Sequence, residues 1–164
     1  ITDAGMVHLK NLTSLKLLRL SGTAVTDEGL VHLKGLQLES LYIPQGAQTD
    51  LGLKYYLAAL KTPAALHFPN WRVTDKGMVH LKNLTSLQLL RLSGTAVTDE
   101  GLIHLKGLTS LKRLDLIGTK ITDEGLVHLK QLTNLQKLNL SRTNITDAGV
   151  SDLQMALPNC KILH

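Results

Sequence analysis

Leucines recur along the chain at fixed positions, with a period of 24 residues. In the copy at 12–35, Leu18 and Leu20 end an L-x-x-L-x-L pattern, and Leu30 and Leu33 follow three residues apart. The alternation predicts a short strand with both leucines on one face. The three-residue spacing predicts a helix that turns its apolar side toward the same interior.

Copies of this pattern fill the whole chain. Regular copies lie at 12–35, 84–107, 108–131 and 132–155, irregular ones around 36–59 and 60–83, and partial ones at 1–11 and 157–164. One copy cannot bury its leucines alone, whereas stacked neighbours can, and at least about three are needed. We therefore predict a single domain over 1–164, built of six 24-residue repeats with a partial repeat at each end. We expect it to be part of a longer protein.

Two long segments of the chain are nearly identical. Residues 1–35 and 73–107 differ at only four positions, which indicates duplication of a block of three repeats. Every copy also keeps a glycine in its helical half: Gly5, Gly29, Gly52, Gly77, Gly101, Gly125 and Gly149. Because glycine inside a helix costs about 1 kcal/mol relative to alanine, its retention predicts a close approach where helices of successive repeats meet.

The repeated string L-x-x-L-x-L-S-G-T-x-V-T-D-E-G-L resembles the cysteine-containing class of leucine-rich repeats, which is best known beside F-box domains in substrate receptors. The resemblance spans the whole chain. It departs where that class has its cysteine, as in similar bacterial proteins, by carrying Thr23, Thr95, Thr119 and Thr143. No segment resembles an F-box, so a ubiquitin-ligase role does not carry over. The resemblance implies a horseshoe-type scaffold and protein recognition, and it names no partner.

The predicted fold class is therefore α/β, a right-handed leucine-rich-repeat solenoid with one parallel sheet on its concave side and helices on its convex side. We expect strands near 17–21, 40–44, 65–69, 89–93, 113–117 and 137–141. We expect helices near 27–34, 50–60, 75–82, 99–106, 123–130 and 147–156. Leu18, Leu20, Leu30, Leu33 and their equivalents should be buried.

Catalytic motifs are missing from the sequence. It has no phosphate-binding glycine loop, no nucleophile elbow and no zinc-protease helix, so we expect no enzyme and no cofactor. The single cysteine, Cys160, excludes an intramolecular disulfide. No apolar run approaches the roughly 18 residues of a membrane-spanning helix, so no membrane partner is expected.

Two columns of polar residues invite a metal. A histidine column (His8, His32, His80, His104 and His128) falls in the helical halves of the repeats. Zinc ligands lie about 2 Å from the metal, whereas packed helices lie about 8–10 Å apart, so we favour a solvated convex surface over a metal site. An aspartate column that includes Asp3, Asp27 and Asp75 suggests either calcium binding or helix capping and first-turn dipole complementarity, and the second is favoured. Thr26-Asp27 stands where a helix should begin, as cap and first-turn acid.

The net charge of +5 conceals a segregation of charge along each repeat. Most acids fall in the first helical turn, whereas the strand segments and the turns after them carry most of the arginines and several lysines. A basic concave side could steer an acidic protein or a nucleic acid toward it. Simple solubility is the alternative explanation.

The outward strand positions are the candidate partner-binding residues. One column holds Arg19, Tyr42, His67, Arg91, Asp115 and Asn139, and it varies where the leucines do not. We add Trp71, because the aromatic residues cluster in the irregular copies and aromatic rings dominate binding hot spots. The alternative is that these rings fill space left by missing leucines.

We therefore predict a protein-binding scaffold that recognises its partner, which could be acidic, through the concave strand face. One alternative is nucleic-acid or polyanion binding by the basic face. Another is a structural unit that assembles through its open ends. The N-terminal partial copy supplies a helix but no strand, so the strand at 15–20 should be an uncovered edge, open to pairing with another chain.

Overall fold

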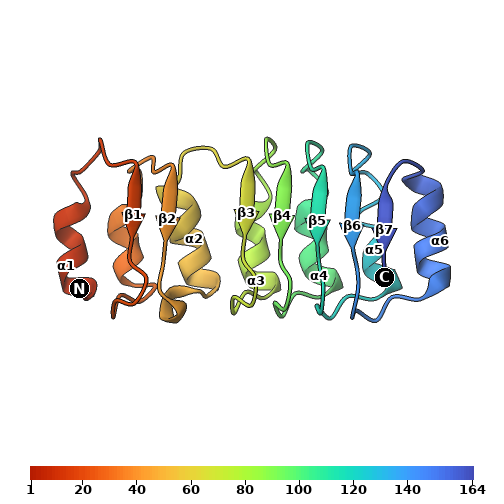
Figure 1. Ribbon diagram of the computed structural model, residues 1–164, viewed down its shortest axis with the longest axis horizontal. Coiled ribbons are helices and arrows are strands. Elements are labelled where there is room, and N and C mark those ends of the chain that lie inside the picture. Colours follow the sequence, from red (N-terminus) through yellow and green to blue (C-terminus); the bar gives the residue numbers. More distant parts are fainter. The chain divides into compact units, whose positions relative to one another are not determined.

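The computed structural model describes residues 1–164 and divides the chain into two compact units, Ile1–Pro63 and Ala64–His164. They are called unit 1 and unit 2 below, and each is described by itself. Both are built from short parallel strands that alternate with short helical segments, as Figure 1 shows.

Unit 1 holds two strands and five helical segments. In chain order they are α1 (Asp3–Met6), the 3-10 turn η1 (Val7–Leu9), β1 (Leu17–Arg19), η2 (Gly29–Leu33), β2 (Ser40–Tyr42), η3 (Gln45–Ala47) and α2 (Asp50–Ala59). The two strands pair in parallel, with Leu18 opposite Leu41. β1 therefore has a neighbouring strand on one side only, as predicted for the N-terminal edge.

Unit 2 holds a five-stranded parallel sheet with its strands in chain order. Its elements are β3 (Ala65–His67), α3 (Asp75–Met78), η4 (Val79–Leu81), β4 (Leu89–Arg91), α4 (Asp99–Leu102), η5 (Ile103–Leu105), β5 (Arg113–Asp115), α5 (Asp123–Leu126), β6 (Lys137–Asn139), α6 (Asp147–Ala156) and β7 (Lys161–Leu163). In Figure 1 the helices α3, α4 and α5 lie on one face of this sheet, which leaves the other face open. The predicted α/β class is confirmed.

Each predicted strand is present, but it is three residues long rather than five. The chain turns immediately after the second buried leucine. In the first regular repeat, both the amide and the hydroxyl of Thr23 donate hydrogen bonds to the carbonyl of Leu20. Gly22 makes the turn with a φ of 74°, a conformation that glycine adopts without strain. Thr23 thus closes the turn that ends the strand segment.

The strands form two sheets rather than the one sheet predicted. The division falls in an irregular repeat, where Pro63 stands at a position that the regular repeats fill with leucine. The amide of that leucine donates a hydrogen bond three residues back, as from Leu87 to Leu84 and from Leu111 to Leu108. Proline has no amide hydrogen and cannot make this turn.

Leucine forms most of the core. The middle residues of β4, β5 and β6, which are Leu90, Leu114 and Leu138, are at most 2% exposed. Leu18 is the exception, because it is only half-buried in the edge strand β1, and Leu12 nearby is 47% exposed. The prediction that Leu18 is buried is therefore wrong, for the reason that no strand covers that side of β1.

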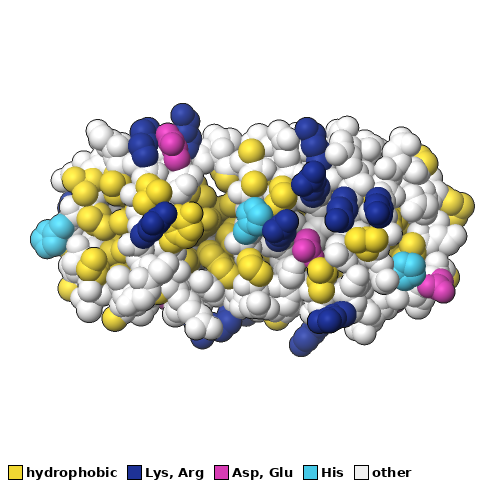
Figure 2. All heavy atoms as spheres, in the orientation of Figure 1, with side chains coloured by type: hydrophobic (Ala, Val, Ile, Leu, Met, Phe, Trp, Pro, Cys, Tyr) yellow, Lys and Arg dark blue, Asp and Glu magenta, His cyan; other side chains and the backbone are white.

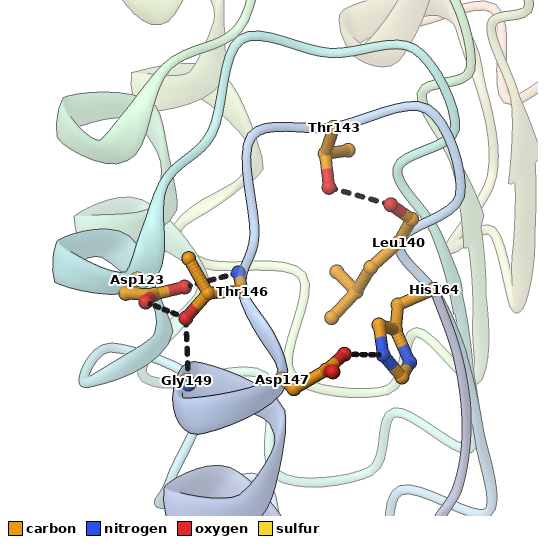
Figure 3. A network of polar contacts seen from close by, with 7 residues as sticks. All are labelled: Asp123, Leu140, Thr143, Thr146, Asp147, Gly149 and His164. Carbon is orange, nitrogen blue, oxygen red and sulfur yellow. Dashed lines mark hydrogen bonds and ion pairs between the residues drawn. The ribbon is translucent and has the colours of Figure 1, made fainter.

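Aspartates clamp each repeat to the next. Asp75 accepts two hydrogen bonds from Thr98, one from the amide at 2.8 Å and one from the hydroxyl at 2.7 Å. The same clamp joins Asp123 to Thr146, as Figure 3 shows. The threonine caps the helix, since Thr146 Oγ1 accepts a hydrogen bond from the amide of Gly149, and Asp147 is the acid of the first turn. The order expected from Thr26-Asp27, cap and then first-turn acid, is therefore present at this helix.

The recurring glycine makes room for this clamp. A Cβ added to Gly101 would overlap with Oδ1 of Asp75, and one added to Gly125 would overlap with Oδ1 of Asp99. The predicted close approach is confirmed at these positions. What approaches is the carboxylate of the preceding repeat, so glycine and aspartate act as a pair.

Candidate binding surface

In unit 1 the charged side chains in and beside the strands already have partners within the unit. The guanidinium of Arg19 lies 5.2 Å from the centroid of the Tyr42 ring, a cation–π contact. One residue before β1, Lys16 pairs with Glu39 at 3.7 Å. The structure thus places Arg19 and Tyr42 side by side, as the last residues of paired strands.

In unit 2 four predicted site residues form a continuous row. The strand register sets His67 beside Arg91, Arg91 beside Asp115, and Asp115 beside Asn139. His67 and Arg91 are exposed, and the other two are half-buried. Partial burial, helped by the charge of Arg91, lowers the pKa of His67, so its imidazole is neutral near pH 7. We call this row the polar row.

The carboxylate of Asp115 and the amide of Asn139 are held in place by their own turns. Asp115 Oδ1 accepts a hydrogen bond from the amide of Ile117, and Asn139 Oδ1 accepts one from the amide of Ser141, both at 3.1 Å. In each side chain one oxygen accepts the hydrogen bond of the turn, and the other polar atom can bind a ligand. The two positions are therefore preorganised for polar contacts.

A second row lies along the other outward position of the same strands. It consists of the first strand residues, set side by side by the register: Ala65, Leu89, Arg113, Lys137 and Lys161. Sequence analysis counted the three cations among the basic strand residues but did not name them as site residues. The signal was available, because positions two apart in a strand share a face.

The two rows border a groove of about 380 Å³ on the strand face of unit 2. Its lining is Leu89, Leu90, Arg91, Arg113, Leu114, Asp115, Gln136, Lys137, Asn139 and Lys161. Figure 2 shows basic side chains gathered over β4 to β7, with little acid among them. The groove thus combines an aliphatic floor with a basic wall.

Trp71 does not belong to this surface. It is only 8% exposed, and its ring lies 4.6 Å from that of Phe68, which is fully buried. The burial of the ring speaks against Trp71 as a partner-binding residue. Here the rings fill core volume in the irregular repeats, as the alternative explanation held. Tyr42, at 49% exposed, is the aromatic residue that does reach the strand face.

The remaining titratable groups do not assemble into a metal centre. No group of three or more His, Cys, Asp or Glu side chains is placed to hold a metal ion. In the histidine column, burial lowers the pKa of His128, whose Nδ1 is buried without a hydrogen-bond partner. None of the helices has the length and apolar character needed to cross a membrane.

Two family models match the sequence. The one described as Leucine Rich repeats (2 copies) matches residues 109–155, and the one described as Leucine Rich repeat matches residues 11–34 and 83–106. Together the matches cover more than half of the chain. The chain belongs to the leucine-rich-repeat family, a class of domains that commonly mediates protein binding.

Solved structures of the same fold include two internalins of Listeria monocytogenes. Internalin C2 matches at 26% identity and a TM-score of 0.66, over 99% of this chain and 65% of its own. Internalin InlF matches at 22% identity and a TM-score of 0.62, over 96% of this chain and 49% of its own. The chain thus spans between half and two thirds of these neighbours. No curated protein matches it significantly.

Proposed function

We propose that the chain is a protein-binding module that recognises its partner through the strand face of its repeats. The observation that carries this proposal is the groove of unit 2, where the polar row stands on strands whose middle residues are buried leucines. Such an arrangement separates recognition from folding, because outward side chains can change without loss of the core. Membership of the leucine-rich-repeat family supports it.

The same residues favour binding over catalysis. The polar row has no nucleophile beside a general base. One carboxylate oxygen of Asp115 already accepts a hydrogen bond from the amide of Ile117. We therefore propose a binding module rather than an enzyme. Kinship with the cysteine-containing repeat class is part of the proposal, since Thr95 and Thr119 are buried at the position of its cysteine.

Nucleic-acid or polyanion binding is the second candidate, favoured by the cations that line the groove. It predicts steep salt dependence, because each neutralised phosphate releases a counterion. Binding of heparin and of single-stranded DNA, measured across a salt series, tests it. Affinity for a protein partner with no comparable affinity for either polyanion would reject it.

The proposal is tested by photo-cross-linking in an extract of the source organism. A photoreactive residue at Arg91 probes the strand face, and one at the exposed Val127 probes the helix side of the same unit. A partner captured from Arg91 and not from Val127 is expected. Capture from Val127 alone would overturn the proposal.

The captured partner, once purified, allows a quantitative test by calorimetry. Replacing Arg19, Tyr42, His67 and Arg91 by alanine together should weaken binding by at least about tenfold, since a few interface residues dominate affinity. The melting temperature should fall only modestly, because most exposed substitutions cost less than about 0.5 kcal/mol and the cation–π contact of Arg19 with Tyr42 adds about 0.5–1 kcal/mol. A control variant, Lys82→Ala with Lys106→Ala, alters exposed residues outside the strand face and should bind normally.

A further inference from the structure

The strand face of unit 2 carries three cations that no side chain of the protein neutralises. Arg113, Lys137 and Lys161 begin β5, β6 and β7, and the register sets each beside the next. All three are exposed, and none takes part in an ion pair of the structure. Neighbouring strands lie about 4.8 Å apart, so the charges form a row roughly 10 Å long. We call it the basic row.

The basic row is unfavourable within the folded protein. Like charges on directly opposed strand positions repel one another, and none of the three cations has a carboxylate within ion-pair distance. In unit 1 the lysine just before β1, Lys16, has Glu39 within 3.7 Å. A negatively charged ligand would place beside the cations of unit 2 the negative charge that Glu39 places beside Lys16 in unit 1.

We propose that the groove of unit 2 binds an acidic segment of a partner protein, with carboxylates of the segment paired to Arg113, Lys137 and Lys161. This rests on the proposed function, because it names the chemistry of the partner for the same strand face. The guanidinium can hold one carboxylate through two parallel hydrogen bonds, and the ammonium groups act as point charges. Leu89, Leu90 and Leu114 line the groove and can contact aliphatic parts of the segment.

The composition of the groove favours a peptide over a nucleic acid. Sequence-tolerant binding of single strands depends on aromatic side chains that stack with the bases. Both aromatic rings of unit 2, Phe68 and Trp71, are buried. Asp115 also lines the groove and would repel a phosphate backbone, whereas a neutral side chain of a peptide can donate a hydrogen bond to it.

The spacing of the basic row favours a helical segment. Successive turns of an α-helix rise about 5.4 Å, close to the spacing of about 4.8 Å between strands. Alternate residues of an extended peptide lie nearly 7 Å apart, which fits the row less well. The ligand is therefore an acidic helix with carboxylates in three successive turns, laid across the strands.

A defined probe tests this with the purified chain. The probe is a fluorescent helical peptide with glutamates in three successive turns, and its control carries glutamine at those positions. Fluorescence anisotropy at low salt should show saturable binding of the glutamate peptide and little of the glutamine peptide. Added salt should weaken it, because exposed charges are screened.

Two triple variants with equal loss of charge separate the site from general attraction. Arg113→Gln, Lys137→Gln and Lys161→Gln should together weaken the glutamate peptide by at least about tenfold. The matched control, Lys76→Gln, Lys82→Gln and Lys106→Gln, removes three exposed lysines from outside the groove of the same unit. Its affinity should change by less than about twofold, since distant exposed charges are screened.

Asp115→Asn is a gain-of-affinity test. The substitution removes the only carboxylate that lines the groove. It keeps the turn, because Asn139 makes the same hydrogen bond one repeat later. The peptide should bind several-fold more tightly to this variant.

Any of four results would overturn the inference. The two triple variants could weaken the peptide equally, which would mean attraction by net charge alone. The glutamine peptide could bind as well as the glutamate peptide. Single-stranded DNA could bind more tightly than the peptide and lose its affinity in the strand-face triple variant, which would make the face a nucleic-acid site. Finally, the partner captured from Arg91 could bind the Arg113→Gln, Lys137→Gln, Lys161→Gln variant with normal affinity. That result would leave the proposed function intact and reject only the acidic ligand.

Discussion

Residues 1–35 and 73–107 are almost the same sequence in two different surroundings. They differ at four positions, yet Leu90 in β4 is fully buried while its counterpart Leu18 in β1 is half-buried. The strand β4 pairs on both sides, with β3 and β5, whereas β1 pairs only with β2. Burial in this protein is therefore decided by the neighbouring repeat, not by the repeat itself.

The helical halves of the two segments make the same point. Thr98 is held by Asp75 through two hydrogen bonds, and Thr26 is held by Asp3 in the same way. The segment after Thr98 forms α4 and then a 3-10 turn, whereas the segment after Thr26 forms only the 3-10 turn η2. An irregular repeat follows η2, and a regular repeat follows α4. Two segments that differ only at Val31 and Ile103 therefore take the conformation that the next repeat supports.

The largest predicted difference between the segments concerns the strand leucine. Leu90→Ala should destabilise unit 2 by about 2–5 kcal/mol, because it leaves a cavity in a packed core. Leu18→Ala should cost clearly less, since the half-buried side chain loses less contact. Urea denaturation of both variants, followed by fluorescence and circular dichroism, measures this. Equal losses would contradict the view that neighbouring strands set burial.

The second prediction is that replacement by alanine has opposite effects on stability at two of the glycines. Gly101→Ala should destabilise the protein, because the new Cβ would overlap with the carboxylate of Asp75. Gly5→Ala should stabilise it by up to about 1 kcal/mol, the ordinary helix preference for alanine, because the nearest atom to that Cβ is 3.8 Å away. Thermal melting of the two variants measures both effects. A Gly101→Ala variant that is more stable than the wild type would contradict the claim that this glycine makes room for the carboxylate of Asp75.

The third prediction concerns pH. Hydrogen bonds from the amide and hydroxyl of Thr26 lower the pKa of Asp3 below the ordinary value of an aspartate. A lowered folded-state pKa adds stability above the unfolded value, and this stability is lost as the pH falls through the folded value. Asp3→Asn should therefore melt earlier than the wild type at pH 7, and the gap should close in strong acid. A gap that persists there would point to lost packing instead.

The smallest predicted effect separates the two equivalent arginines. Arg19→Ala should cost about 0.5–1 kcal/mol, the usual size of an exposed cation–π contact, because Arg19 lies over Tyr42. Arg91→Ala should cost less than about 0.5 kcal/mol, as exposed substitutions usually do. Differential scanning calorimetry on the two single variants, with Tyr42→Ala added to each, checks whether the coupling is confined to Arg19.

Sequence reasoning found most of the fold because the leucine period carries it. The positions of the strands and helices follow from that period, and so does the alternation that points Arg91 and Asp115 outward. It missed the division into two sheets, because a proline at position 63 changes backbone hydrogen bonding without disturbing the period. It also missed the clamp between repeats, since the hydrogen bonds from Thr98 to Asp75 join residues 23 positions apart.

The binding surface was only partly predictable for a related reason. Arg19, His67 and Arg91 lie at alternate strand positions that point away from the core, which is a local property of the sequence, and the structure agrees with it. The burial of Trp71 depends on the ring of Phe68 beside it. The basic row depends on strand register, which brings together Arg113 and Lys137 from different repeats. Such contacts are set by stacking, and a single repeat does not encode them.

The central claim is that the strand face binds the partner, and methyl NMR with the purified partner tests it most directly. Leu89 lines the groove, whereas Ile103 in η5 and Val127, which directly follows α5, are exposed outside the groove of the same unit. The account predicts that titration shifts the methyl signals of Leu89 and leaves those of Ile103 and Val127 in place. Shifts confined to Ile103 and Val127, with Leu89 unmoved, would contradict it.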